Sequence, residues 1–205
     1  GSYYIHNLPN ATCITNEELS SVYLKIIKMF GEVIQCKPVN SYDKTSAYSR
    51  DIKVISNSNH FYSTSAMQPL HNDYAYYPYN KAGNYLSLFC LEPCDHGGIT
   101  SLISIAKIKE LAKLYSEELY EKMCNVVFTY IHIDDNETTI VKKPFFDSNQ
   151  YINWNYYQIK PENNDEDTMN TREEIFSFFK NIISDGNMYD ISIKWKRGDA
   201  IIFND

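Results

Sequence analysis

The chain has 205 residues, of which 43% are hydrophobic and 15% aromatic, so it is long enough for one buried core and too short for two domains of ordinary size. Its formal net charge of -7 argues against a phosphate-binding groove, which needs clustered Lys and Arg, and therefore against a nucleic-acid partner. No apolar run approaches the ~18 residues of a membrane span and no signal-peptide pattern opens the chain, so we expect a cytoplasmic protein without a membrane partner.

The first predicted element is an amphipathic helix. Thr15-Asn16-Glu17-Glu18 is a capping-box pattern, and apolar residues follow it at helical spacing until Gly31 stops the run. Two short strands are expected next, near Val33–Cys36 and Ile52–Ile55, with a polar stretch between them.

The middle of the chain is expected to contain two strands and a long helix. The run Tyr85–Leu91 predicts a buried strand, Gly97-Gly98 a turn, and Ile99–Ile103 the next strand. Apolar residues at helical spacing then predict one helix over Ile105–Met123.

Three further strands are expected, at Val126–Ile133, Thr139–Val141 and Ile152–Ile159. The most polar and acidic stretch of the chain, Pro161–Asn170, predicts a mobile loop.

The last part of the chain is expected to hold a helix and a hairpin. Thr171 can cap a helix that runs through Ile183. Ile191–Trp195 and Ala200–Phe203 predict a hairpin that turns on Arg197-Gly198-Asp199. Strands are in the majority, so the expected fold class is mainly β with added helices (α+β), as a single β-barrel or jelly-roll domain over residues 1–205.

The strongest chemical signal is His71-Asn72-Asp73. On an extended strand, side chains two residues apart point to the same face, so His71 and Asp73 could bind one metal ion. Imidazole and carboxylate, completed by a second imidazole, form the facial set that leaves positions open on ferrous iron.

His132-Ile133-Asp134 repeats the pattern and serves as an internal control. Asp135-Asn136 follows it with turn chemistry, so Asp134 is expected to end a strand and not to face a cavity. The tripeptide alone is therefore a weak signal.

Other segments in a fixed order strengthen the first copy. Here the chain resembles the iron(II)- and 2-oxoglutarate-dependent oxygenases of the taurine dioxygenase and clavaminate synthase-like superfamily. The segments that carry the resemblance are Pro69-Leu70-His71-Asn72-Asp73-Tyr74-Ala75-Tyr76, Leu88-Phe89-Cys90-Leu91-Glu92-Pro93, Gly97-Gly98-Ile99-Thr100-Ser101-Leu102 and Trp195-Lys196-Arg197-Gly198-Asp199-Ala200-Ile201-Ile202-Phe203.

The resemblance implies a double-stranded β-helix in which His71 and Asp73 bind iron(II) and act in catalysis. It also implies that the Thr100 hydroxyl helps to bind the cosubstrate 2-oxoglutarate, although a β-branched strand residue is an alternative there. Tyr74 and Tyr76 would lie beside the metal and contact the substrate, with ordinary core packing as the alternative. Related halogenases replace the carboxylate at the position of Asp73, so its presence favours an oxygen-driven oxidation.

In the family, the strand that here ends at Ile201–Asp205 runs on to a second ligand His and to an Arg that pairs with 2-oxoglutarate. We therefore expect that the domain lacks its C-terminal part in the sequence as given. A pseudoenzyme with two ligands is a further possibility. The other histidines do not follow the Gly198-Asp199 strand, and they are His6, His60, His96 and His132.

The resulting hypothesis is an iron(II)- and 2-oxoglutarate-dependent oxygenase that uses molecular oxygen to oxidise, most simply to hydroxylate, a small molecule such as an amino acid or a natural-product intermediate. The alternative from another class is a non-catalytic jelly-roll module with a degenerate metal site. A cupin-type metal enzyme would need more His residues near His71, and oligomeric state is not encoded in any pattern that we recognise.

Overall fold

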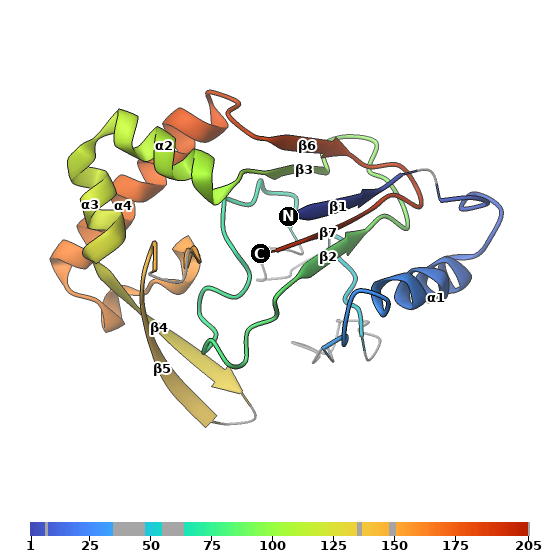
Figure 1. Cartoon of the computed structure of the whole chain (residues 1–205), viewed down its shortest axis with the longest axis horizontal. Coiled ribbons are helices and arrows are strands. Elements are labelled where there is room, and N and C mark those ends of the chain that lie inside the picture. Colours follow the sequence, from blue (N-terminus) through green and yellow to red (C-terminus); the bar gives the residue numbers. More distant parts are fainter. Residues whose placement is uncertain (7, 35–47, 55–63, 135–136, 148–150, 205) are drawn as a thin grey trace. The chain divides into compact units, whose positions relative to one another are not determined.

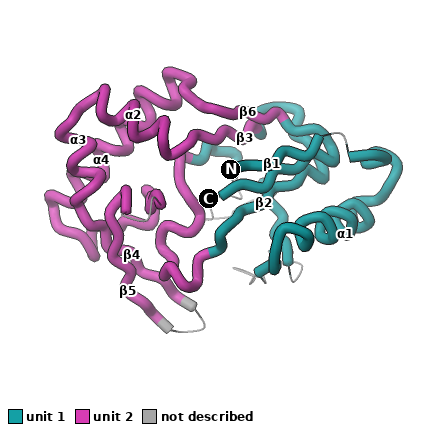
Figure 2. Tube along the Cα trace, in the orientation of Figure 1, with its two compact units in different colours: residues 1–68, 83–98, 195–204 teal, residues 69–82, 99–194, 205 magenta. Residues whose placement is uncertain are grey.

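The computed structural model describes residues 1–6, 8–34, 48–54, 64–134, 137–147 and 151–204 (Figure 1). The chain divides into two compact units (Figure 2). Unit 1 comprises Gly1–Gln68, Gly83–Gly98 and Trp195–Asn204, and unit 2 contains Pro69–Ala82 and Ile99–Lys194. None of the helices in the described ranges is both long and apolar enough to cross a membrane.

Unit 1 contains a three-stranded antiparallel sheet. Strands β1 (Ser2–Ile5) and β2 (Leu86–Phe89) pair with the two edges of β7 (Ala200–Phe203). The central strand β7 is apolar and its first three residues are buried. The strand predicted over Tyr85–Leu91 is thus confirmed in its centre.

The amphipathic helix of unit 1 is α1 (Asn16–Ile27), and its capping box is confirmed. The Thr15 hydroxyl accepts the backbone N–H of Glu18 at 3.2 Å, and the Glu18 carboxylate accepts that of Thr15 at 2.9 Å. Leu19 and Tyr23 form the buried stripe, and the Tyr23 ring stacks on Phe89 of β2 at 4.2 Å. The sequence pattern therefore determines both the start of this helix and the face that packs on the sheet.

The two short strands predicted after α1 are not found where the structure describes the chain. Residues 33–34 and 52–54 have no strand, and the remaining positions of both predictions lie outside the described residues.

Unit 2 contains two antiparallel strand pairs. Strands β3 (Ile99–Leu102) and β6 (Ile191–Lys194) form one pair, and β4 (Val127–Asp134) and β5 (Glu137–Pro144) form a long hairpin. The predicted strands over 99–103, 126–133 and 191–195 are confirmed, and the strand predicted over 139–141 is longer than expected.

The helical part of unit 2 is α2 (Ile105–Tyr115), α3 (Glu117–Asn125) and α4 (Glu166–Phe178), followed by a π-helix over Phe179–Ser184. The single helix predicted over 105–123 is interrupted at Ser116, whose backbone is extended and whose hydroxyl accepts the Leu119 N–H at 3.2 Å. A serine that caps a new helix has separated the two segments.

Three predictions for the second half of the chain are wrong. Residues 152–159 form an isolated bridge and a 3-10 turn, Tyr156–Gln158, in place of a strand. The predicted mobile loop over 161–170 contains a second 3-10 turn, Pro161–Asn163, and the first turn of α4. Asp165, and not Thr171, caps that helix by accepting the Thr168 N–H at 2.8 Å.

The predicted hairpin over residues 191–203 is also wrong, although both of its strands exist. Strand β6 pairs with β3, and β7 pairs with β1 and β2. The turn itself forms, since Asp199 donates its N–H to the Lys196 carbonyl at 2.9 Å and Gly198 has a φ of 85°. Local turn chemistry is therefore correct, but the two strands join different sheets.

The core of unit 2 is built from helices α2, α3 and α4 and from one face of the β4–β5 hairpin, with the aromatic residues after the hairpin between them. Its largest fully buried members include Phe128, Tyr130, Phe145, Trp154 and Phe178. The α+β class is thus confirmed, whereas the sheets of the described residues are small and not closed. The double-stranded β-helix therefore stays a prediction.

Candidate functional site

His71-Asn72-Asp73 lies in unit 2, in an irregular stretch and not in the strand that the prediction assumed. Its central residue holds it against the core. The Asn72 N–H donates to the Trp154 carbonyl at 2.9 Å, and the Asn72 side-chain oxygen accepts the Trp154 N–H at 2.7 Å. This two-way contact fixes the backbone between the two candidate ligands.

His71 and Asp73 nevertheless point toward each other. His71 Nε2 lies 3.2 Å from Asp73 Oδ1, and the two side chains are 24% and 48% exposed. Two ligand atoms about 2.1 Å from one ion and at right angles lie about 3 Å apart, so this separation fits one metal ion. The irregular stretch thus brings both side chains together, as the predicted strand would have done.

The hydrogen bond of His71 Nδ1 determines which ring nitrogen is available to a metal ion. Nδ1 lies 2.8 Å from the Pro69 carbonyl oxygen, which can only accept a hydrogen bond, so Nδ1 carries the proton. Because a carboxylate accepts hydrogen bonds, the 3.2 Å contact with Asp73 places a second proton on Nε2 in the metal-free chain. Loss of that proton would free the Nε2 lone pair on the side of Asp73, as a metal-binding imidazole requires.

The described part of the chain offers two ligands for this site. It contains no group of three or more His, Cys, Asp or Glu side chains that could hold a metal ion. His6 in unit 1 donates through Nδ1 to the buried Asp199 at 2.9 Å, and His96 is exposed. His60 lies outside the described residues.

The control tripeptide behaves as predicted. His132 is buried in strand β4, which ends at Asp134. The same His-x-Asp spacing therefore yields a strand end in one place and a converging pair of side chains in the other.

The two predicted substrate-binding tyrosines belong to an aromatic cluster beside the motif. The Tyr74 ring meets Tyr77 edge-on at 5.3 Å, and Tyr76 lies 4.8 Å from Tyr77 and 6.1 Å from His132. Tyr77 in turn lies 4.4 Å from His132. These contacts join the segment after Asp73 to the inner face of β4, so packing explains part of the tyrosine run.

The predicted cosubstrate ligand Thr100 lies on another element. It is half-buried in β3, opposite Ile193 of β6. The preceding turn is confirmed, because Gly97 and Gly98 have φ values of 70° and 65°, which favour glycine. The structure thus brings His71 and Asp73 together and places Thr100 on a separate strand.

The prediction missed a buried lysine next to the same segment. Lys143 on β5 is 2% exposed, and its ammonium lies 4.1 Å from the centroid of the Tyr79 ring. The Tyr79 hydroxyl donates to Asp147 at 2.5 Å. Burial lowers the pKa of Lys143 to about 8, and burial together with the Asp147 hydrogen bond raises the pKa of Tyr79. The signal was present, because Lys143 follows Val141 at the spacing of one strand face.

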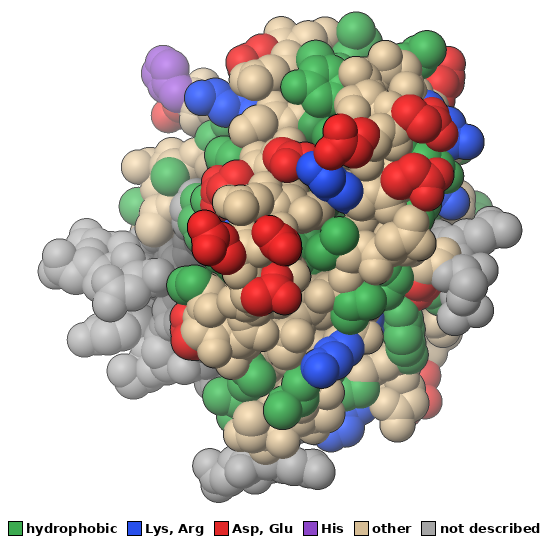
Figure 3. Space-filling model, turned by 90° about the vertical axis from the view of Figure 1, so that its left-hand side faces the viewer, with side chains coloured by type: hydrophobic (Ala, Val, Ile, Leu, Met, Phe, Trp, Pro, Cys, Tyr) green, Lys and Arg blue, Asp and Glu red, His purple; other side chains and the backbone are tan. Residues whose placement is uncertain are grey.

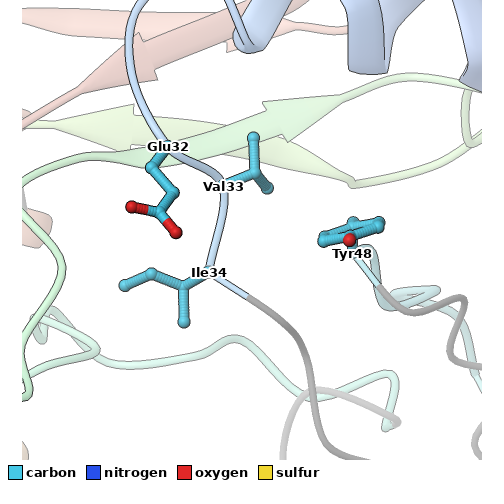
Figure 4. A pocket seen from close by; sticks show the side chains of 4 residues that line it. All are labelled: Glu32, Val33, Ile34 and Tyr48. Atoms are coloured by element: carbon cyan, nitrogen blue, oxygen red, sulfur yellow. The ribbon is translucent and has the colours of Figure 1, made fainter.

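Two surface hollows are lined by other residues. One, of about 480 Å³, is lined by Glu32, Val33, Ile34 and Tyr48 of unit 1, with Tyr48 on a separate stretch from the other three (Figure 4). The other, of about 530 Å³, lies in unit 2, and its lining includes Lys122, five residues of α4 and the N-cap residue Asp165. Acidic side chains gather on the face that carries α3 and α4 (Figure 3). Neither hollow is lined by a predicted site residue.

The chain was compared with known proteins and protein families. The model of the family described as taurine catabolism dioxygenase TauD, TfdA family matches residues 13–204. The match includes His71, Asp73 and Thr100 and confirms the resemblance that the sequence motifs suggested. A comparison with curated protein sequences gives no significant match. Because the family model spans nearly the whole chain, the chain belongs to the taurine catabolism dioxygenase TauD, TfdA family.

Proposed function

We propose that this protein is an iron(II)- and 2-oxoglutarate-dependent dioxygenase that hydroxylates a small molecule such as an amino acid or a natural-product intermediate. Family membership supports the general activity, since proteins of this family are typically such dioxygenases. The observation that carries the site assignment is the 3.2 Å approach of His71 Nε2 to Asp73 Oδ1. In this proposal the whole chain belongs to one double-stranded β-helix domain.

Iron(II) and 2-oxoglutarate, when bound, would supply the oxidation of a carbon–hydrogen bond by molecular oxygen. His71 and Asp73 would hold the metal. The hydrogen bond from His71 Nδ1 to Pro69 would keep the deprotonated Nε2 directed at the ion, and the Asp73 carboxylate would offset part of the charge of the ion. Asn72 contributes by fixing the backbone between the two ligands.

Thr100, Tyr74 and Tyr76 would complete the surroundings. The Thr100 hydroxyl would donate a hydrogen bond to a carboxylate of 2-oxoglutarate. The tyrosine rings would exclude water and shape the substrate cavity. Asp73 favours oxidation over halogenation, because a carboxylate occupies the position that halide takes in the related halogenases.

A metal titration tests the assignment. We expect the protein to bind Mn(II), used as a redox-stable substitute for Fe(II), and His71→Ala to weaken binding at least about tenfold. His96→Ala changes an exposed histidine outside the motif and should leave binding unchanged. Equal Mn(II) affinity of the protein and His71→Ala would overturn the site. Substrate-stimulated succinate formation with Fe(II) and 2-oxoglutarate, measured across a panel of amino acids, tests the reaction.

A non-catalytic binding module is the second candidate. It is favoured by the two-ligand set of the described residues, which is one ligand short of the facial triad. The same titration separates the two functions, because a degenerate site would bind Mn(II) no better than the His71→Ala variant does.

A further inference from the structure

The β4–β5 hairpin belongs to unit 2 (Figure 1), and its two faces differ in burial. Its inner face packs into the core through buried residues such as Tyr130 and Val141. Its outer face is also apolar, yet it is open to solvent, because Ile133 is 70% and Ile140 is 64% exposed. A two-stranded ribbon with β-branched residues on both faces is unusual for a surface element, since such faces are normally covered.

The two edges of this hairpin differ as well. On the β4 edge, the Asn164 side chain accepts the Thr129 N–H at 2.8 Å and donates to the Thr129 carbonyl at 3.1 Å. A side-chain amide thus blocks that edge against a further strand. Thr129 stands opposite Lys142, so the backbone groups of Lys142 point to the outer edge of β5.

The same direction holds for every second residue of β5. Thr138, Ile140 and Lys142 therefore present their N–H and C=O groups on one edge. Within the described ranges these groups have no hydrogen-bond partner. The centre of β5 is thus an open edge that carries an exposed isoleucine.

We propose that two copies of this chain associate by antiparallel pairing of their β5 strands, about a two-fold axis at Ile140. In this register Ile140 pairs with Ile140 of the second copy, and Thr138 pairs with Lys142 of the second copy. All three residues have a backbone N–H, so every group on the open edge finds a partner. The pairing is self-complementary, as a two-fold interface requires.

The side chains fit this register. Ile131 stands opposite Ile140 within the hairpin, so the pairing extends a row of isoleucines across both copies on the outer face. Lys142 stands across from Thr138 of the second copy, and not from another lysine. The register sets no like charges opposite each other, and Pro144, which lacks an N–H, limits the paired stretch.

Sedimentation equilibrium of the whole chain tests the association. We expect a monomer–dimer equilibrium whose dissociation constant rises about tenfold or more in Ile140→Lys, because two lysines would meet at the axis. Ile99→Lys changes an isoleucine of β3 that is 60% exposed, and it should leave the equilibrium unchanged. A protein that is monomeric at all concentrations, or equal dimerisation of both variants, would overturn the proposal.

Thiol cross-linking tests the register. Paired residues of this kind have Cα atoms about 5.5 Å apart, which is within reach of a disulfide. Ile140→Cys should give a covalent dimer on mild oxidation, above the background set by the exposed Cys13 and Cys94 in the unmodified chain. Ile133→Cys, on β4, should not exceed that background. Cross-linking of Ile133→Cys without cross-linking of Ile140→Cys would contradict the proposed pairing of the β5 strands. A monomeric chain whose β5 edge binds a peptide of another protein would likewise contradict it.

Discussion

Lys143 shows how a single side chain can limit the stability of unit 2. Its ammonium is buried among Tyr79, Asp147 and the inner face of the hairpin, where the Tyr79 ring and the Asp147 charge offset only part of the lost hydration. Because burial lowers its pKa to about 8, the folded protein releases this proton more readily than the unfolded chain does.

This predicts a rise in stability with pH. The unfolded chain keeps the lysine proton up to its ordinary pKa near 10.5, so it binds more protons than the folded protein between about pH 8 and that value, and the free energy of unfolding increases. Between pH 7.5 and 9.5 we expect a gain of about 1–2 kcal/mol, measured by urea unfolding. Burial raises the pKa of Cys90 from 9.0 to about 11, so this thiol begins to oppose the rise above about pH 9. The raised pKa values of Tyr79 and Tyr130 add to that opposition above about pH 10.

Two variants test whether Lys143 causes this rise in stability with pH. Lys143→Met should remove this rise and stabilise the protein at neutral pH, whereas Lys142→Met, on the exposed face of the same strand, should preserve it. A pH profile that persists in Lys143→Met would show that another group titrates.

Asn72 is the second residue whose role can be measured. Its side-chain oxygen accepts the Trp154 N–H at 2.7 Å, so Asn72→Ala should loosen the segment between His71 and Asp73 and weaken Mn(II) binding about tenfold. Asn72→Asp retains an oxygen for that N–H and should recover most of the affinity. Calorimetric titration with Mn(II) of the unmodified protein and of both variants measures these affinities. An unchanged Mn(II) affinity in Asn72→Ala would show that Asn72 does not position the ligands.

The site residues were predictable to different degrees for physical reasons. The pairing of His71 with Asp73 was predictable from their spacing, because side chains two residues apart lie on one side of an extended segment, and the irregular stretch retains this arrangement. The anchoring of Asn72 was not predictable, since its partner Trp154 is distant in sequence. Lys143 was missed because a lysine in a strand is ordinarily taken to be solvated.

At the scale of elements, local signals located the segments better than they located their partners. The capping box of α1 and the double-glycine turn before β3 are both determined by neighbouring residues. The pairing of β6 with β3 and of β7 with β1 depends instead on long-range contacts, which a turn at Gly198 does not encode. The sequence therefore predicted where most strands lie but not which strands pair with each other.

Arg197 explains why that turn holds its place in unit 1. Its guanidinium donates to the Ala11 carbonyl at 2.8 Å and the Ile14 carbonyl at 2.9 Å, and also to the Leu91 carbonyl. Gly198 beside it packs so closely that a Cβ would lie 2.5 Å from that of Ala11. The turn is thus tied to two other stretches of unit 1.

We predict that Arg197→Met destabilises the protein by about 2–4 kcal/mol, because three part-buried carbonyls lose a charged donor. Lys196→Met, at an exposed neighbouring position, should change the free energy of unfolding by less than about 0.5 kcal/mol. Chemical unfolding followed by circular dichroism measures both, and equal stability of the two variants would remove Arg197 from this role.

At the scale of the whole molecule, the family match runs through residues of both units. The family resemblance could be predicted from the sequence, because several motifs in a fixed order carried it and not a single tripeptide. Whether the sheets close could not be predicted, since closure depends on pairings between strands far apart in the chain. The third ligand of the facial set has no counterpart in the described residues, and the spacing of His71 and Asp73 contains no information about it.

Metal binding at the proposed site would be coupled to folding, because a ligand that binds only the folded protein stabilises it. Segment Pro69–Ala82 belongs to unit 2 and is held to its core through Trp154. We therefore expect saturating Mn(II) to raise the melting temperature by about 2–6 °C and EDTA to reverse the rise. Asp73→Ala should abolish the shift while melting near the metal-free protein, because its side chain is half exposed. A shift of equal size in Asp73→Ala would place the bound metal elsewhere, and its absence in the unmodified protein would favour the non-catalytic module.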